Sequence, residues 1–134
     1  CGVKTNKTGW CWGYGGLGQL TGSYDHALSP RQVLGTWRTI HTGQTFTCGI
    51  KRDRSLWCWG LNGAGQLGDG TTTNSLTPVH VILPAGATSV SLGFAHACAE
   101  TTTHEVYCWG SDTKGQIGNG AATSTPVLTP TRVL

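Results

Sequence analysis

A motif that occurs three times along the chain constrains its fold more than any other feature. Each copy begins with Cys-Trp-Gly and ends with Gly-Gln-Leu or Gly-Gln-Ile, and the copies start at Cys11, Cys58 and Cys108. The starts lie 47 and 50 residues apart, and a period of about 40 to 50 residues is typical of β-propeller blades. In a chain of 134 residues, the pattern predicts three consecutive blades in one architectural unit.

The composition favours short strands over helices. The chain has 21 glycines, 5 prolines and 6 tryptophans, which indicates many tight turns around a few large aromatic anchors. No window carries apolar residues at helical spacing over three turns without an interrupting glycine or proline. We therefore expect an all-β fold whose blades each have four short antiparallel strands.

Prolines mark the expected blade boundaries. After each motif copy, a proline is followed three residues later by valine, at Pro30, Pro78 and Pro130. We expect a single propeller segment over 1–134, with blade units at about 1–29, 30–77 and 78–129 and with 130–134 starting the next blade. The strands expected for the middle unit are 36–41, 46–50 and 55–59, with an exposed tip at 52–54. Because 1–134 starts inside a hairpin and stops in a strand, we expect either a piece of a longer propeller or head-to-tail completion by another copy.

Side chains of the motif are expected to hold neighbouring blades together. Strand side chains alternate, so the aromatic residues that flank the second cysteine of each hairpin lie on the face opposite to it. Both faces of a blade then need cover from its neighbours, because exposed indoles are unfavourable. In the closing loops, Leu20, Leu67 and Ile117 are expected to point inward. Hydrogen bonds between blades are expected from the side chains of Gln19, Gln66 and Gln116.

The six cysteines form three pairs with the same separation of ten residues. Nine intervening residues, divided around a three-residue turn, place two cysteines opposite each other in an antiparallel hairpin, where a disulfide can form. The predicted bonds are Cys1–Cys11, Cys48–Cys58 and Cys98–Cys108. Each closes a loop for which the chain-entropy model gives about 2.8 kcal/mol of stabilisation. A zinc site would need cysteines two to four residues apart, so no metal is expected.

The disulfides also indicate a compartment. Such bonds persist in oxidising environments, so we expect an extracellular or cell-surface protein. Asn6-Lys7-Thr8 is an N-glycosylation sequon at the expected tip of the first hairpin. We therefore expect Asn6 to be accessible to a glycan.

Several function classes receive no support from the sequence. The net charge is +3 with only 11% charged residues, which gives no basic surface for nucleic acid. No apolar stretch approaches the roughly 18 to 20 residues that span a bilayer. Residues 13–18 are rich in glycine but lack the Lys-Ser/Thr ending of a phosphate loop. The histidines and carboxylates are scattered without a catalytic pattern, so we expect no enzyme and no cofactor.

Binding is expected at the loops, because propellers carry function on their rims. Aromatic, amide and charged groups in these loops could hold a protein edge or a sugar. The candidates are Tyr14, Tyr24, Asp25, His26, Leu61, Asn62, Asp112 and Lys114.

The repeated string resembles the repeat of the regulator of chromosome condensation family, over the whole chain. The middle unit matches best, from Phe46 to Gly70, and its Asn62 is replaced by Gly15 and Asp112 in the other copies. The resemblance implies a β-propeller, typically with seven blades. The founding member exchanges nucleotide on a small nuclear GTPase, but three disulfide-bonded hairpins argue against a nuclear protein. Secreted relatives include surface proteins, a β-lactamase inhibitor and modules of large extracellular proteins, so the fold alone names no partner.

Three functions fit these features. The first is a non-enzymatic extracellular structural or adhesion scaffold, including a subunit of a surface appendage or filament. The second is a secreted protein-binding or inhibitor domain, and the third is a carbohydrate-binding propeller. The expected partners are proteins, either copies of this chain or flanking blades, with glycans as the alternative.

Overall fold

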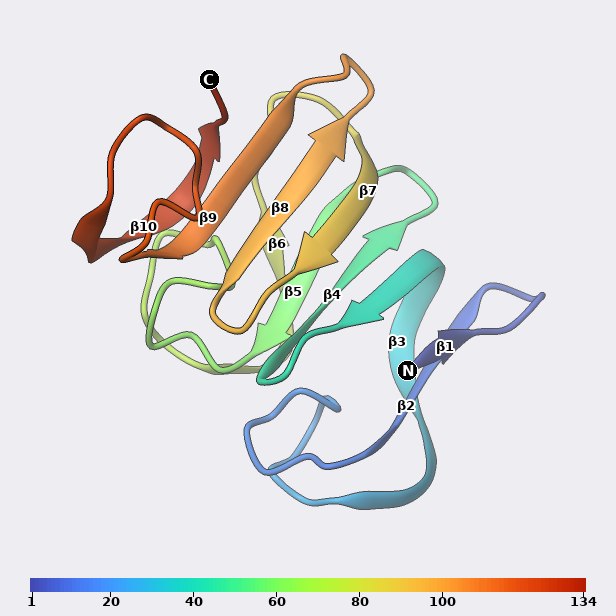
Figure 1. Cartoon of the computed structure of the whole chain (residues 1–134). Helices are drawn as coiled ribbons and strands as arrows, with labels where there is room; N and C mark the ends of the chain where they lie inside the picture. The colour runs from blue at the N-terminus through green and yellow to red at the C-terminus, as the bar shows by residue number, and fades with distance from the viewer.

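A computed structural model describes residues 1–134 as an all-β chain of three blades (Figure 1). No helix is present that could cross a membrane. The strands are β1 (Gly2–Val3), β2 (Thr8–Gly13), β3 (Ala27–Thr42), β4 (Phe46–Lys51), β5 (Leu56–Gly60), β6 (Ser75–Val81), β7 (Ala87–Leu92), β8 (His96–Thr101), β9 (Val106–Asp112) and β10 (Thr123–Arg132).

Each blade is a meander of antiparallel neighbours. Blade 3 is the sheet β7-β8-β9-β10. Blade 2 consists of the second half of β3 with β4, β5 and β6, and blade 1 consists of β1, β2 and the first half of β3. Because β3 serves two blades, blades 1 and 2 form one continuous six-stranded sheet. The predicted all-β blades are confirmed, with three strands in blade 1 and four in each of the others.

The blade boundaries lie later than the prolines suggested. Val33 pairs with Gly9, so Pro30 lies within the outer strand of blade 1, and the chain enters blade 2 only after Gly35, whose φ is 110°. Proline is tolerated there because an outer strand needs no N–H on its free edge. Pro78 lies in β6 in the same way.

The last residues also belong to an existing blade. Thr131 pairs with Cys108 and Arg132 pairs with Tyr107, which makes them part of the outer strand of blade 3. The expectation that 130–134 starts a further blade, free to complete another copy, is therefore wrong. Val133 N also donates to Val106 O at 2.9 Å, so this segment bonds within blade 3.

All three predicted disulfides are present. Cys48 lies opposite Cys58 and Cys98 lies opposite Cys108 in the strand register. The Cα atoms are 4.0, 4.0 and 4.1 Å apart for the pairs Cys1–Cys11, Cys48–Cys58 and Cys98–Cys108. Each bond links the two strands of one hairpin, so each blade is closed within itself and contacts between blades are noncovalent.

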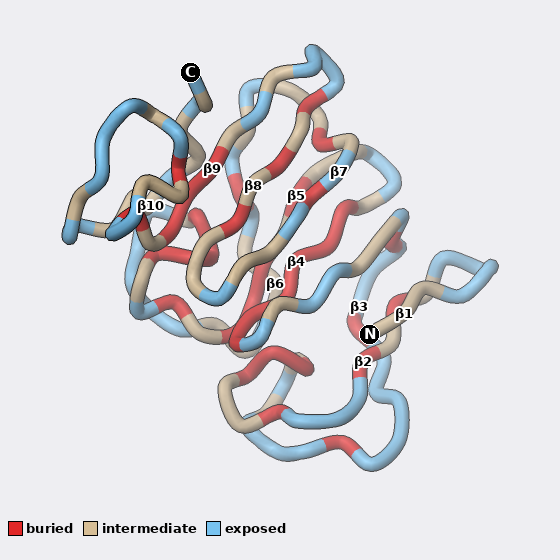
Figure 2. The backbone as a smooth tube through the Cα atoms, in the orientation of Figure 1, coloured by how far each residue is buried: buried red, intermediate tan, exposed pale blue.

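The core lies between the blades (Figure 2). Between blades 1 and 2, Cys11 and Leu20 pack with Trp37 and Trp59. Between blades 2 and 3, the disulfide of blade 2 packs in a cluster that includes Trp109. The disulfide face of one blade therefore meets the indole face of the next, as the alternation of strand side chains predicted.

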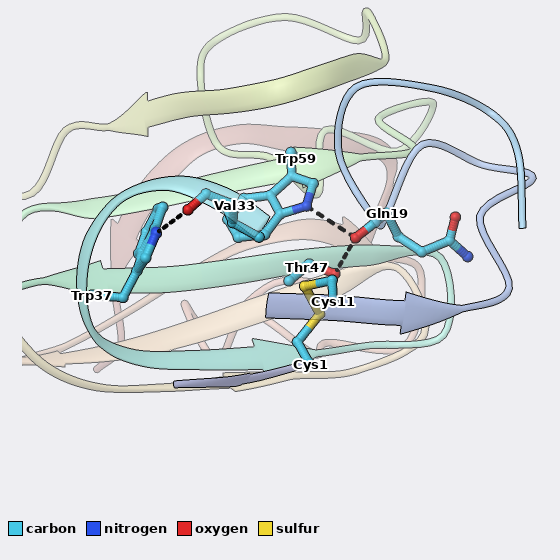
Figure 3. The surroundings of a disulfide bond; sticks show 7 residues. All are labelled: Cys1, Cys11, Gln19, Val33, Trp37, Thr47 and Trp59. Carbon is cyan, nitrogen blue, oxygen red and sulfur yellow. Dashed lines mark hydrogen bonds between the residues drawn. A yellow bond between two sulfur atoms is a disulfide. The ribbon is translucent and has the colours of Figure 1, made fainter. Parts of the chain in front are cut away.

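One hydrogen bond recurs at both blade interfaces. The indole Nε1–H of Trp59 donates to the main-chain oxygen of Gln19 at 2.9 Å, and Trp109 donates to that of Gln66 at 2.9 Å. The Thr47 hydroxyl also donates to the Gln19 oxygen (Figure 3). All of these groups are buried, so the bonds are shielded from water.

The glutamine side chains do not link the blades, contrary to expectation. The Oε1 atom of Gln19 accepts from the N–H of Leu17, two residues earlier in its own loop. The same bond forms at the other two positions, from Ala64 to Gln66 and from Lys114 to Gln116. The glutamine side chain accepts from a backbone N–H of its own loop and so holds the shape of the loop. The main-chain oxygen of Gln19 and Gln66 accepts the hydrogen bond from the next blade.

A buried amide organises the closing loop of blade 2. The Asn62 side chain has no exposed surface; its Oδ1 accepts from Leu67 N at 2.9 Å. Its Nδ2 donates to the carboxylate of Asp69 at 3.2 Å and to the main-chain oxygens of Thr71 and Thr73 at 3.0 Å each. One side chain thus satisfies backbone groups along the whole loop.

Asp112 occupies this position in blade 3 and is also fully buried. Its Oδ1 accepts from Ile117 N at 3.1 Å, which matches Asn62, but its Oδ2 has no hydrogen-bond partner. The prediction that Asn62 and Asp112 are exposed binding groups is wrong, because the loop folds around these side chains to satisfy its own amides.

The comparison predicts the effect of exchanging the two side chains. Asp112→Asn replaces a buried carboxylate, one oxygen of which has no partner, by the neutral amide that blade 2 uses at this position, so we expect it to raise the free energy of unfolding by about 1 kcal/mol. Asn62→Asp removes that donor and should lower stability by about 1 to 3 kcal/mol. Guanidinium unfolding at pH 7 measures both changes. A stability loss in Asp112→Asn would contradict this account of the loop.

The interface bond gives a second prediction. Trp59→Phe removes the indole donor and part of the buried volume between blades 1 and 2, and we expect a loss of about 2 to 4 kcal/mol. Trp57→Phe is the matched control, since Trp57 bonds only to Ser55 of its own hairpin. Its expected loss is about 1 kcal/mol by the same reasoning. Equal losses of unfolding free energy in the two variants, measured by denaturant unfolding, would show that the hydrogen bond between blades stabilises the fold no more than the bond within the hairpin.

Candidate binding site

The closing loop of blade 1 presents aromatic groups to solvent. Tyr14 is 59% exposed and Tyr24 is 53% exposed. The rings of Tyr14 and His26 lie 4.7 Å apart between centroids, tilted by 39°. Tyr24 and Asp25 lie in the same loop and are exposed. The structure therefore brings four of the predicted residues onto one loop, which we name the aromatic loop (residues 14–26).

Hydrogen bonds brace the aromatic loop. Gly15 N donates to Nδ1 of His26 at 3.3 Å, so the imidazole proton of the neutral ring belongs on Nε2. Arg31, on the outer strand of the same blade, donates to the Ser23 hydroxyl at 2.9 Å and to the His26 carbonyl at 3.5 Å. These contacts hold both ends of the loop.

Blade 1 differs from its neighbours because Gly15 replaces the buried asparagine. A Cβ at Gly15 would collide with the main-chain oxygen of Asp25, so the backbone of the loop fills the space that Asn62 occupies in blade 2. In blade 2 the backbone N–H of Asn62 donates to the side-chain oxygen of Asn74. In blade 1 the backbone N–H of Gly15, at the equivalent position, donates to the imidazole of His26. The different hydrogen-bond acceptor in blade 1 thus places an imidazole beside Tyr14.

The remaining predicted residues lie apart from the aromatic loop. Leu61 is half-buried at the start of the closing loop of blade 2, and Lys114 is exposed in that of blade 3. They occupy related places in separate blades, so they add no group to the aromatic loop itself.

The outer face of blade 1 forms a second surface, which the sequence did not single out. A hollow of about 460 Å³ is lined by Val3, Lys4, Trp10, Trp12 and Pro30, with Gly2 at its edge. Trp12 is 50% exposed, whereas Trp59 and Trp109 at the equivalent positions are fully buried. Among residues 1–134, no blade lies in front of Trp12. The motif alone could not show this, because all three copies read Cys-Trp-Gly.

The sequon at Asn6 lies at the exposed tip between β1 and β2. Asn6 Oδ1 accepts from the backbone N and hydroxyl of Thr8, at 3.2 and 2.7 Å. Asp53 and Ser55 make the same pair of bonds in blade 2, and the Ser55 hydroxyl lowers the pKa of the Asp53 carboxyl. The Asn-x-Thr pattern therefore has a structural role in the turn.

The other titratable side chains form only small surface groups. No three His, Cys, Asp or Glu side chains are placed to hold a metal ion. His80 stacks on Trp57, with ring centroids 4.8 Å apart. His104 contacts Glu100 at 3.3 Å on the surface. On blade 3, Glu105 pairs with Arg132 at 3.1 Å and accepts from the Tyr107 hydroxyl at 3.2 Å.

Family models match the middle of the chain. One model of the regulator of chromosome condensation (RCC1) repeat matches residues 38–66 and 87–116, and a second model of the same repeat matches 53–99. Together they cover 38–116, which is more than half of the chain. No curated protein sequence matches it.

Solved structures share the fold over almost the whole chain. Prp20p of Saccharomyces cerevisiae superposes with a TM-score of 0.88 at 18% identity, covering 98% of this chain and 35% of that one. Yeast RCC1 (Prp20) bound to Kap60 gives 0.82 at 20% identity, covering 98% and 34%. Human WBSCR16 gives 0.79 at 21% identity, covering 98% and 36%. The chain thus spans about a third of the length of these propellers. From its matching repeats, it belongs to the RCC1-repeat family.

Proposed function

We propose that this chain is a non-enzymatic extracellular scaffold that binds other proteins through its loops and blade faces, including as a subunit of a surface appendage or filament. The observation that carries the proposal is the aromatic loop, where exposed Tyr14 and Tyr24 lie on a braced backbone. Two features support it further: the chemistry of that loop and the disulfides of the blades.

Aromatic side chains on a held loop suit a protein interface. Tyrosine is enriched at the energetically important centres of interfaces because it buries a large area at a small cost in side-chain entropy. The contacts of Arg31 and His26 reduce the freedom that the loop would lose on binding. The loop therefore favours protein recognition over a purely solvated turn.

Disulfides within each hairpin support an extracellular location. Such bonds form and persist where thiols are oxidised. The exposed Asn6 would carry a glycan there in a eukaryotic secretory pathway, since its turn uses Oδ1 while the glycan attaches at Nδ2.

The similar solved structures support the general class of partner, a protein. One is described by its binding to Gsp1p and histones, and another was solved in complex with Kap60. Those partners are properties of the yeast protein. For this chain they support only the class of partner, a protein.

Site-specific crosslinking tests the aromatic loop. We expect a photoreactive benzoylphenylalanine at Tyr14 to crosslink a discrete extracellular protein, identified by mass spectrometry, while the same group at Thr102 on the tip of blade 3 does not. Tyr14→Ser with Tyr24→Ser should weaken binding of that protein at least tenfold, which is about 1.4 kcal/mol. Circular dichroism of the double variant controls for folding.

Other outcomes distinguish the alternative functions. Tight one-to-one binding of one enzyme, with loss of its activity, would favour the inhibitor domain over the scaffold. Binding to a glycan array that depends on Tyr14, without a crosslinked protein, would favour the carbohydrate-binding propeller. Equal crosslinking from Tyr14 and Thr102 would contradict a binding role for the loop.

The compartment can be tested separately. Alkylation and mass spectrometry of the secreted chain should find no free thiol and only the three bonds within hairpins. We expect reduction to lower the free energy of unfolding, by up to about 2.8 kcal/mol for each bond in the chain-entropy model. Free thiols in the chain from its native source would argue against the extracellular assignment.

A further inference from the structure

Six of the nine lysine and arginine side chains lie on one side of blades 1 and 2. They belong to the β1–β2 turn, the β4–β5 turn and the strand residues beside them: Lys4, Lys7, Arg38, Lys51, Arg52 and Arg54. Figure 1 shows the two turns projecting from the same side of the molecule. Asp53 is the only carboxylate in these segments. The cations come from separate parts of the sequence, so the net charge of +3 does not reveal that they gather.

Three of these cations line one hollow between blades 1 and 2. Lys7, Arg38 and Arg52 surround an open volume of about 400 Å³, and no other residue lines it. All three are exposed, and none of them forms an ion pair. The carboxylate of Asp53 accepts instead from the backbone N and hydroxyl of Ser55, at 3.0 and 2.6 Å. The positive charge around the hollow is therefore not neutralised within the chain.

The backbone fixes the place of these cations. Lys7 has a φ of 68°, and its carbonyl accepts from Trp37 N of blade 2 at 2.8 Å. Arg38 is the extra residue of a β-bulge, because the partners of Trp37 and Thr39 on β4 are adjacent residues. A bulge changes the direction of a side chain relative to a regular strand. Arg52 begins the turn that follows β4.

The same backbone arrangement recurs between blades 2 and 3 with only one cation. Arg54 has a φ of 68°, and its carbonyl accepts from Ala87 N of blade 3 at 2.8 Å. The bulge recurs at Thr88, and the turn after β8 begins with Thr102. The Thr88 hydroxyl donates to a main-chain oxygen of its own blade at 3.1 Å. Blades therefore stack in this way without three cations, so the basic residues between blades 1 and 2 are not required by the fold.

We propose that the hollow lined by Lys7, Arg38 and Arg52 binds the sulfate groups of a sulfated polysaccharide. The planar guanidinium groups of the two arginines can each donate paired hydrogen bonds to the oxygens of one sulfate, and Lys7 adds a point charge. The hollow is open, so a polymer can continue beyond it toward the other cations of the two turns. The choice of an extracellular polyanion rests on the proposed extracellular location, whereas the charge site does not.

A nucleic acid suits the hollow less well. Proteins hold single strands by stacking bases on aromatic side chains, and no aromatic side chain lines this hollow. The nearest hairpin indoles already face lysines, with Lys4 Nζ 4.1 Å from the Trp10 centroid and Lys51 Nζ 3.7 Å from the Trp57 centroid. A sulfated glycan needs only charge and hydrogen-bond donors, which the hollow supplies.

Calorimetric titration with sucrose octasulfate and with dextran sulfate tests the proposal. The chain is secreted by a bacterial host, so that no glycan on Asn6 lies beside Lys7. At physiological ionic strength we expect one sucrose octasulfate per chain and binding of dextran sulfate. Arg38→Gln with Arg52→Gln should weaken both at least tenfold, with an unchanged circular dichroism spectrum.

A matched control removes the same charge elsewhere. Lys114→Gln with Arg132→Gln changes two cations of blade 3 and should bind within about twofold of wild type, because salt screens charges beyond about 8 Å. Tyr14→Ser with Tyr24→Ser should also bind dextran sulfate as wild type does. A failure of the aromatic loop is thus distinguished from a failure of the hollow.

A gain of binding tests the comparison between the two blade interfaces. Thr88→Arg with Thr102→Arg supplies the two missing cations beside Arg54, so we expect this variant to bind a second sucrose octasulfate. Circular dichroism controls for its folding. A folded variant that still binds a single molecule would contradict the assignment of the site to these three positions.

Three other results would overturn the proposal. The first is no binding of dextran sulfate at physiological ionic strength. The second is equal weakening by the blade 3 control, which would show attraction by net charge alone. The third is equally tight binding of single-stranded DNA that is lost in Arg38→Gln with Arg52→Gln, which would assign the hollow to nucleic acid.

Discussion

The hydrogen bond from a tryptophan indole to a glutamine carbonyl sets the relation between successive blades. It joins an aromatic side chain on a central strand to the backbone of a loop in the preceding blade, at 2.9 Å in both interfaces. Burial of both groups makes an unpaired state costly. The stacking of blades therefore depends on the shape of the closing loop, which presents the carbonyl.

The disulfides and the indoles stabilise different parts of the structure. Each disulfide closes a single hairpin, which restricts the unfolded chain but does not link blades. The packing of sulfur atoms against indoles then joins one blade to the next. The disulfides therefore stabilise single hairpins, and the indoles stabilise the stacking of one blade on the next.

Local sequence spacing predicted the hairpins and disulfides well, because register in a hairpin follows from counting residues. It failed where the answer depends on how a loop folds on itself. Every residue has a carbonyl, so no sequence pattern shows that Gln19 uses its main chain toward blade 2 and its side chain within the loop. Asn62 resembles an exposed loop amide until its five loop contacts are known. Trp12 and Trp59 have the same flanking residues, but within residues 1–134 only Trp59 packs against a preceding blade.

The departures of blade 1 from the repeat coincide with its candidate binding groups. Where blades 2 and 3 bury Asn62 and Asp112 in the closing loop, blade 1 has Gly15, and its loop is held instead by the backbone of Asp25 and by His26. Because these contacts lie inside the loop, the side chains on its outer side are not needed to hold its shape. In blade 1 those positions carry tyrosines, whereas the corresponding loop of blade 2 is occupied by Thr71, Thr73 and Asn74, which bond within the loop. The repeat therefore keeps its blade contacts constant and varies the exposed groups of its closing loops.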